Sequence, residues 1–147
     1  MEFQIDKPIT AEQLEAYYEL RWRILRAPWN QSRGSERDEF EEVADHVTAL
    51  DESGRIIGVG RLQLNSASEA QIRFMAVEAD CRGCGVGRAI VARLETLARG
   101  RQVERIVLNA REEVVGFYAR LGYEIVGAGP TLFDEVAHAK MAKVWGD

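Results

Sequence analysis

The stretch CRGCGVGR, residues 81–88, supports two competing interpretations. Its two cysteines have the Cys-x-x-Cys spacing used by redox dithiols and by metal sites. Its three glycines, at positions 83, 85 and 87, lie between two arginines, and glycine lets a bare backbone approach a phosphate group. Because the chain has no other cysteine, the choice between these interpretations largely decides the predicted function.

The residues on either side favour a phosphate-binding loop. A strand-like run ends at Val77, and a helix is predicted to start near Gly85. The N-terminus of a helix offers unpaired N–H groups and a partial positive charge, and Arg82 and Arg88 add to it. The sequence therefore predicts an anion site of pyrophosphate size. The predicted helix has apolar residues at helical spacing, at Val86, Ile90, Leu94, Leu97 and Ala98.

Two common phosphate loops do not fit this stretch. A P-loop requires Gly-Lys-Ser/Thr, whereas Gly87 is followed here by Arg88 and Ala89. The dinucleotide fingerprint requires a third glycine, and Arg88 or Ile90 occupies that position. The loop must therefore belong to another class of phosphate site.

The rest of the chain predicts one α/β domain, residues 1–147, built on a mixed sheet. Thr10 and Gln13 form a capping-box pattern at the start of a first helix. Strands and helices alternate in the centre of the chain, and antiparallel strands flank them. We expect strands at residues 3–5, 46–50, 55–64, 70–77, 104–110, 123–127 and 138–145, and further helices at 35–43, 85–100 and 113–121.

The composition of the chain limits the kinds of partner that we expect it to bind. The chain has 147 residues, a net charge of −5 and no apolar run long enough to span a membrane. The opening residues lack the features of a secretory signal, and two cysteines do not make a disulfide framework. We therefore expect a cytoplasmic protein that binds neither membranes nor nucleic acid.

The charges are unevenly distributed. Residues 82–105 hold six arginines and two acids, which suits an anionic ligand. Residues 36–45 hold six acids and one base, and they could attract a cation if they are exposed. The alternative is that both segments are solvated helix faces.

The motif Arg82-x-x-Gly85-x-Gly87 resembles the acetyl-CoA loop of the GNAT superfamily of N-acetyltransferases. The stretch GFYARLGY, residues 116–123, is similar to a second motif of that superfamily, and the order of strands agrees. Many members carry Asn seven residues before the motif tyrosine; Arg111 stands there, with Asn109 two residues earlier. The resemblance implies a central sheet of about seven strands flanked by about four helices.

The resemblance also implies a reaction, in which an acetyl group passes directly from acetyl-CoA to a primary amine in a ternary complex. Asn109 would face the thioester, and Tyr118 would be the general acid. A phenol suits that role because it is protonated at neutral pH and is close to a thiol in acidity; alternatively, Tyr118 is only a core aromatic. The implied acetyl-CoA contacts are Met75, Ala76 and Val77 along the pantetheine arm, and Arg82, Gly83, Cys84, Gly85, Val86, Gly87 and Arg88 around the pyrophosphate.

The acceptor side is less defined by sequence. We expect Arg21, Trp29, Glu135 and His138 to border it, with a small-molecule or peptide amine as acceptor. The acidic segment 36–45, which we expect to be exposed, would steer a cationic amine toward the site. A homodimer is compatible with the sequence. The candidates for the general base are Glu112, Glu135, His138 and His46, or a water relay.

Two other function classes stay open. One is an acyl-CoA-binding domain without catalysis, acting as a sensor or partner. The other is a thiol redox protein, since a dithiol at a helix N-terminus has a lowered pKa; it leaves the glycines and the tyrosine motif without a role. We expect no metal, because His46 and His138 lie far from the cysteines and lack zinc-finger spacing.

Overall fold

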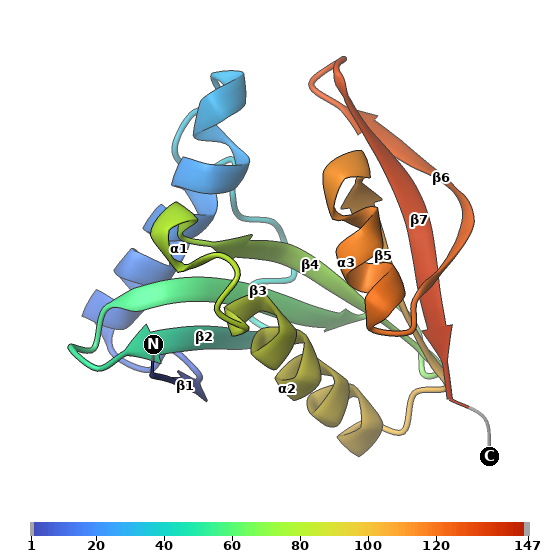
Figure 1. Cartoon of the computed structure of the whole chain (residues 1–147), viewed down its shortest axis with the longest axis horizontal. Coiled ribbons are helices and arrows are strands. Elements are labelled where there is room, and N and C mark those ends of the chain that lie inside the picture. Colours follow the sequence, from blue (N-terminus) through green and yellow to red (C-terminus); the bar gives the residue numbers. More distant parts are fainter. Residues whose placement is uncertain (1, 146–147) are drawn as a thin grey trace.

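The computed structural model describes residues 2–145, which form a mixed α/β fold with one seven-stranded sheet (Figure 1). The strand order is β1-β2-β3-β4-β5-β7-β6, and every neighbouring pair is antiparallel except β4 and β5. This confirms the predicted mixed sheet. The strands are β1 (Phe3–Asp6), β2 (Asp45–Asp51), β3 (Ile56–Leu64), β4 (Glu69–Val77), β5 (Arg105–Arg111), β6 (Glu124–Leu132) and β7 (Val136–Val144).

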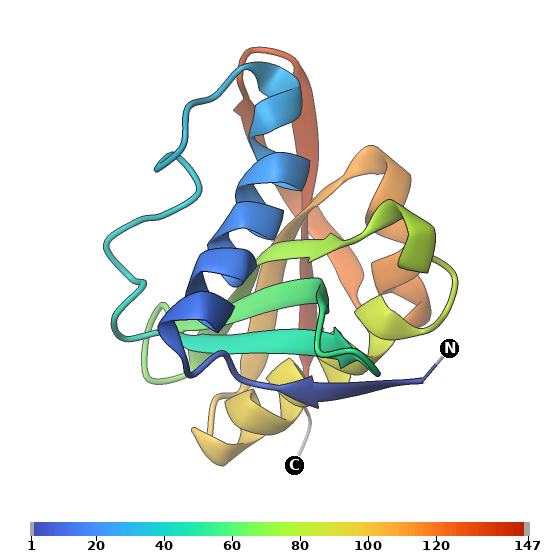
Figure 2. The same cartoon turned by 90° about the vertical axis from the view of Figure 1, so that its left-hand side faces the viewer.

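Three α-helices cover the sheet within the described residues: α1 (Ala11–Leu25), α2 (Val86–Gly100) and α3 (Val115–Arg120). The predicted capping box is present, because Thr10 Oγ1 accepts from the Gln13 N–H at 3.0 Å and Gln13 Oε1 accepts from the Thr10 N–H at 3.1 Å. Helix α1 lies on one face of the sheet, whereas α2 and α3 lie on the other (Figures 1 and 2).

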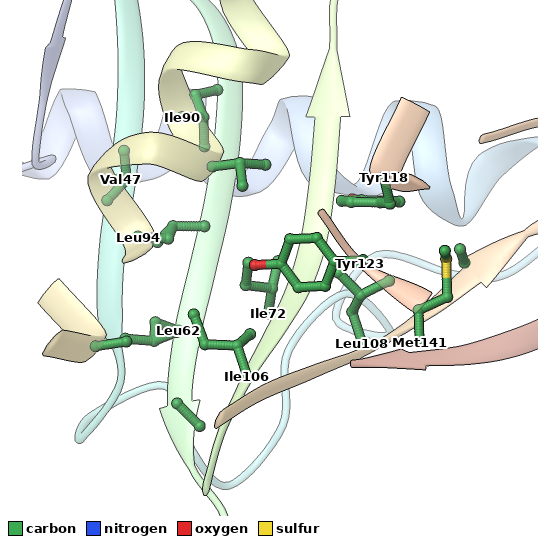
Figure 3. Packing of buried hydrophobic residues seen from close by; sticks show 14 of the residues in the cluster. Val47, Leu62, Ile72, Ile90, Leu94, Ile106, Leu108, Tyr118, Tyr123 and Met141 are labelled. Atoms are coloured by element: carbon green, nitrogen blue, oxygen red, sulfur yellow. The ribbon is translucent and has the colours of Figure 1, made fainter. Parts of the chain in front are cut away.

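Helix α2 packs directly on the backbone of β3. A Cβ atom added at Gly60 would lie 2.7 Å from Ile90 Cγ2, and one at Gly58 would lie 2.8 Å from Val86 Cγ1. Ile90 and Leu94 of α2 are fully buried in the main core (Figure 3). This close contact fixes the start of α2, and therefore the loop before it.

The sheet divides between β4 and β5. The two strands pair only from Glu69–Gln71 to Arg105–Val107, near one end. Beyond that point they separate, and the edge of β4 from Ile72 to Val77 has no strand partner on the β5 side within residues 2–145. The separation opens the sheet at its centre.

The helix predicted at residues 35–43 is wrong: this segment is a series of turns. Its acidic side chains bond to the backbone of the same segment, since Glu36 accepts from the Gly34 N–H, Asp38 from the Phe40 N–H and Glu41 from the Asp38 N–H. Such bonds compete with helical hydrogen bonds. The expected fourth helix is therefore missing from the described part of the chain.

Candidate functional site

A cavity of about 840 Å³ occupies the opening between β4 and β5. Its size falls within the range of ligand sites, roughly 300–1,000 Å³. The end of α1, the loop after β4, α3 and the β6–β7 hairpin complete its walls. Most predicted site residues meet here: Trp29, Met75, Ala76, Val77, Arg82, Gly83, Gly85, Val86, Gly87, Arg88, Asn109, Tyr118 and His138.

The loop before α2 has the backbone that an anion site requires. Gly83 and Gly85 have left-handed conformations, with φ of +80° and +85°, and nothing lies within 4 Å of a Cβ added at either. A Cβ at Gly87 would lie 3.2 Å from Phe117 Cζ. The first turn of α2 has no side-chain cap from the described residues, so its N–H groups are available for a ligand.

The unpaired edge of β4 offers a second set of backbone groups. Met75 and Val77 line the cavity together with Ala76, on the side that β5 leaves open. An extended ligand with amide groups, such as a pantetheine arm, fits such an edge because it can pair as a short strand does. The loop and the edge are continuous, since the loop follows β4 directly.

Tyr118 lies on α3 at the floor of the cavity. Its side chain is buried, and its hydroxyl makes no hydrogen bond to any other described residue. Burial raises the pKa of Tyr118 well above that of a free phenol, although the charge of Arg111 partly opposes this. The phenol is therefore protonated throughout the neutral range, but its acidity is less closely matched to a thiol than the sequence suggests.

Asn109 of β5 and His138 of β7 both lie close to Gly129 of β6. A Cβ at Gly129 would lie 2.9 Å from Asn109 Oδ1 and 3.1 Å from His138 Cβ. His138 Nδ1 lies 3.0 Å from the carbonyl oxygens of Pro130 and Val136. Because carbonyls only accept, Nδ1 must carry a proton, and a neutral ring then has its lone pair on Nε2. This tautomer leaves Nε2 as the hydrogen-bond acceptor of the ring.

Three predicted residues do not line the cavity. Cys84 is exposed, with its Sγ 3.9 Å from the carbonyl oxygen of Arg82, and Glu135 is exposed at the turn between β6 and β7. The third, Arg21, is fully buried. The expectation that Glu135 and Arg21 line the acceptor site is corrected accordingly.

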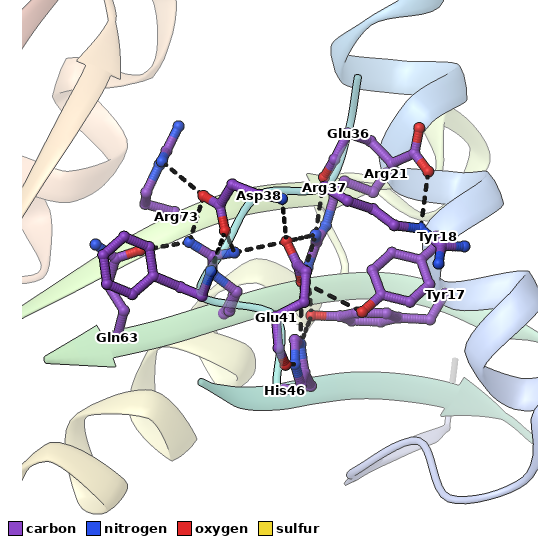
Figure 4. A network of polar contacts seen from close by, with 12 residues as sticks. Tyr17, Tyr18, Arg21, Glu36, Arg37, Asp38, Glu41, His46, Gln63 and Arg73 are labelled. Carbon is purple, nitrogen blue, oxygen red and sulfur yellow. Dashed lines mark hydrogen bonds and ion pairs between the residues drawn. The ribbon is translucent and has the colours of Figure 1, made fainter. Parts of the chain in front are cut away.

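Arg21 instead belongs to a buried polar network (Figure 4). It donates to both carboxylate oxygens of Glu41, at 2.9 and 3.0 Å, and to the hydroxyl of Tyr17 at 2.7 Å. Arg61, also fully buried, pairs with Asp38 and Glu41 at 2.6 Å. Two buried guanidiniums thus depend on two carboxylates from the turns before β2.

This network corrects the expected exposure of the acidic segment. The side chains of Glu36, Glu41 and Asp38 are only 1%, 12% and 18% exposed, because they bond within the protein. Arg21 and Arg61 pair with Glu41 and Asp38, whereas Glu39 and Glu42 of the same segment are exposed. Only part of the acidic charge is therefore available for the steering role that the sequence predicted.

The two cysteines are not joined by a disulfide bond. Both are free thiols, Cys81 buried and Cys84 exposed. Burial and the adjacent Asp80 carboxylate raise the pKa of Cys81, whereas a reactive thiol needs a lowered one. Among residues 2–145, no group of three or more His, Cys, Asp or Glu side chains could hold a metal ion.

Sequence reasoning missed the residues that shape the far end of the cavity. Arg26, Arg73, Phe74 and Arg111 line it, and the ring of Phe133 stacks on Trp29 with 5.9 Å between centroids. An arginine inside an otherwise apolar strand, as in IRFMAV, was the available signal for Arg73. The others come from distant segments and share no motif.

Comparisons with known proteins find N-acetyltransferases. The uncharacterized N-acetyltransferase YjcF of Bacillus subtilis is 26% identical over 132 residues, covering 90% of this chain and 93% of that protein. Chloroplastic serotonin N-acetyltransferase 2 of Oryza sativa subsp. japonica is 37% identical over 76 residues, covering 52% of this chain but only 38% of its own length.

A solved structure shows the same fold over the whole length. An aminoglycoside 6'-N-acetyltransferase complexed with coenzyme A superimposes with a TM-score of 0.79, 19% identity and full coverage of both chains. No helix among residues 2–145 is long and apolar enough to cross a membrane. The family model described as "Acetyltransferase (GNAT) family" matches residues 14–123, and the chain therefore belongs to the GNAT acetyltransferase family.

Proposed function

We propose that this protein transfers an acetyl group from acetyl-CoA to the amine of a small molecule or peptide. The observation that carries the proposal is the single cavity wall formed by the edge of β4 and the glycine loop, Arg82 to Arg88. It offers strand-like pairing groups followed by an anion site, which is the order of pantetheine and pyrophosphate in CoA. The coenzyme A complex of a protein with the same fold supports this donor.

The roles of the side chains follow from their positions in the cavity. Tyr118, protonated and without another hydrogen-bond partner among residues 2–145, donates a proton to the departing thiolate. The charge of Arg111 stabilises negative charge near that phenol. Asn109 reaches the cavity from β5 and orients the thioester.

His138 is the best-placed general base. It lines the cavity, and its Nδ1 proton is held by two carbonyl oxygens, so Nε2 is free to accept a proton from the amine. Of the other candidates, His46 is occupied by Tyr17 and the carbonyl of Glu41, and Glu112 and Glu135 are exposed. Direct transfer then needs only the amine, the thioester and these groups.

The donor is tested by heat unfolding and by calorimetry with acetyl-CoA. A ligand that binds only the folded state raises the Tm, by about 2.7 kcal/mol of stabilisation at 100 times Kd. An unchanged Tm and no binding heat at millimolar acetyl-CoA would rule out every CoA-based function. Release of free CoA across an amine library then separates an enzyme from a non-catalytic acyl-CoA sensor, which binds but releases nothing.

Location and assembly stay predictions of the same proposal. We propose the cytoplasm as the location, as the composition of the chain predicts. A homodimer is checked by sedimentation, and the proposed chemistry does not depend on it because the cavity is built from one chain.

A further inference from the structure

The cavity is strongly positive, and only part of that charge serves the proposed CoA site. Among the described residues that line it, six are arginines and one, Glu113, is a carboxylate. Arg82 and Arg88 belong to the loop before α2. Arg26, Arg73 and Arg111 line the cavity from the end of α1, from β4 and from β5; we call these three the arginine cluster.

The protein neutralises the arginine cluster only in part. Arg26 donates to the carbonyl oxygens of Ser35 and Leu25, both at 3.1 Å, and to no carboxylate among residues 2–145. Arg111 Nε lies 3.7 Å from an oxygen of Glu113, beyond hydrogen-bond length, and that glutamate is 66% exposed.

Arg73 shares its carboxylate partner, Asp38, with Arg61. It contacts Asp38 at 3.1 Å, but Asp38 also pairs with the fully buried Arg61 at 2.6 Å. Burial and the neighbouring arginines lower the pKa values of both Arg26 and Arg73, so each positive charge is unfavourable where it lies. An anion in the cavity would relieve that repulsion.

Aromatic rings hold the arginine cluster in place. Phe74 lies in a bulge of β4 with φ of +57°, a left-handed conformation that is rare for a bulky residue. Its ring carries the guanidinium groups of Arg73 and Arg26 at 4.6 and 5.4 Å, and Trp29 carries that of Arg111 at 5.5 Å. Such strain is common at binding sites, where the surrounding structure maintains it.

We propose that the acceptor amine carries an anionic group, a carboxylate or a phosphate, which binds to Arg26, Arg73 and Arg111. This rests on the proposed acetyl transfer. Guanidinium groups bind such anions with paired hydrogen bonds, and stacking on rings keeps them oriented. The candidate base is close by, since His138 of β7 is the register partner of Arg111 of β5. The acceptor therefore binds with its anion on the arginine cluster and its amine toward His138.

Matched acceptor pairs test this proposal. One arm compares amino acids with their carboxamides, and the other compares phosphoethanolamine with ethanolamine, by free-CoA release. In at least one arm, kcat/KM is expected to be at least ~10-fold higher for the anionic member, as for a charged hydrogen bond. Equal rates within both pairs, or a preference for cationic polyamines, would overturn it. If acetyl-CoA itself fails to bind, the proposed function fails first.

If the protein acetylates no member of either acceptor pair, a measurement of anion binding tests the proposal instead. Sodium phosphate and sodium acetate are titrated into the CoA-saturated protein at constant ionic strength, and the indole N–H of Trp29 is followed by NMR. A saturable shift supports the proposal, and its absence with both salts contradicts it. Saturation with CoA keeps these anions out of the glycine loop.

Substitutions in the arginine cluster test which residues bind the anionic group of the acceptor. Arg26→Gln and Arg73→Gln are each expected to raise KM for the anionic acceptor by ~10-fold or more, without changing KM for acetyl-CoA or kcat/KM for the neutral member. Arg26→Lys should recover part of the loss. Arg93→Gln, on the exposed side of α2, is the matched control. An unchanged acceptor KM in both variants, with unchanged Tm, would contradict the proposal.

Discussion

Two parts of the cavity lining differ in the groups that they present to a ligand. The wall around Gly83 and Gly85 is backbone, exposed by glycines at a helix N-terminus. A second part of the lining consists of arginine and aromatic side chains from the end of α1, β4, β5 and the β6–β7 hairpin. A backbone wall suits a ligand common to a whole family, whereas a side-chain wall can change with each acceptor. Four experiments test this contrast, from the largest expected effect to the smallest.

Gly85→Glu is expected to break the backbone wall. A carboxylate about 4 Å from a phosphate costs about 4 kcal/mol at an effective dielectric constant of 20, which weakens acetyl-CoA binding ~1,000-fold. Calorimetry measures Kd. Gly54→Glu is the control, because Gly54 is also left-handed, with φ of +87° and open space around it, but lies in the β2–β3 turn. Equal Kd values for the two variants would contradict a phosphate site at Gly85.

Glu41→Gln is expected to disrupt the buried polar network and to lower the free energy of unfolding. It removes the carboxylate shared by the fully buried Arg21 and Arg61. Removing one partner of a buried ion pair costs about 3–5 kcal/mol of unfolding free energy. Urea unfolding measures it, with the exposed neighbour Glu42→Gln as control. A loss no greater than that of the control would mean that the network is dispensable.

Tyr118→Phe separates catalysis from binding. Loss of a general acid lowers kcat by at least ~100-fold, whereas Kd for acetyl-CoA should stay unchanged. The matched control is Tyr123→Phe, since Tyr123 is buried beside Tyr118 but its hydroxyl is occupied by Glu95 at 2.9 Å. An unaltered kcat for Tyr118→Phe would reject the proposed acid and leave this tyrosine as a core aromatic.

The smallest expected effect is the pH dependence of folding stability that His46 causes. Burial lowers its pKa below the usual value near 6.5, and Nε2–H donates to the Glu41 carbonyl while Nδ1 accepts from Tyr17. The unfolded chain therefore binds a proton first as pH falls, so stability is full above about pH 6.5 and declines below it, by at most ~1.4 kcal/mol per pH unit.

Urea unfolding from pH 7.5 to 5.5 measures this decline, and His46→Gln should reduce the slope. Comparing the variant with wild type removes the contribution of the carboxylates, which both proteins share. Parallel curves for the two proteins would show that His46 is protonated equally in both states.

The elements that the sequence predicted correctly have local causes. The start of α1 follows from Thr10 and Gln13, three residues apart, and that of α2 from the left-handed Gly85. The helix wrongly predicted at residues 35–43 shows the limit of such patterns. The pattern of its acids indicates a solvated face, but two of them, Asp38 and Glu41, are bound by Arg21 and Arg61, at least 20 residues away in sequence.

By itself, the sequence determined the mixed sheet, the glycine loop and the tyrosine that follows β5, because each depends on residue types at short, fixed spacing. It also favoured the glycines over the cysteines at residues 81–88; in the structure Cys81 is buried at the cavity lining, and Cys84 is exposed and does not line the cavity. Only the tertiary structure decided the acceptor wall. Arg26, Arg73 and Arg111 share no local pattern, and they meet because β4 and β5 separate and the β6–β7 hairpin closes against the end of α1 (Figure 2).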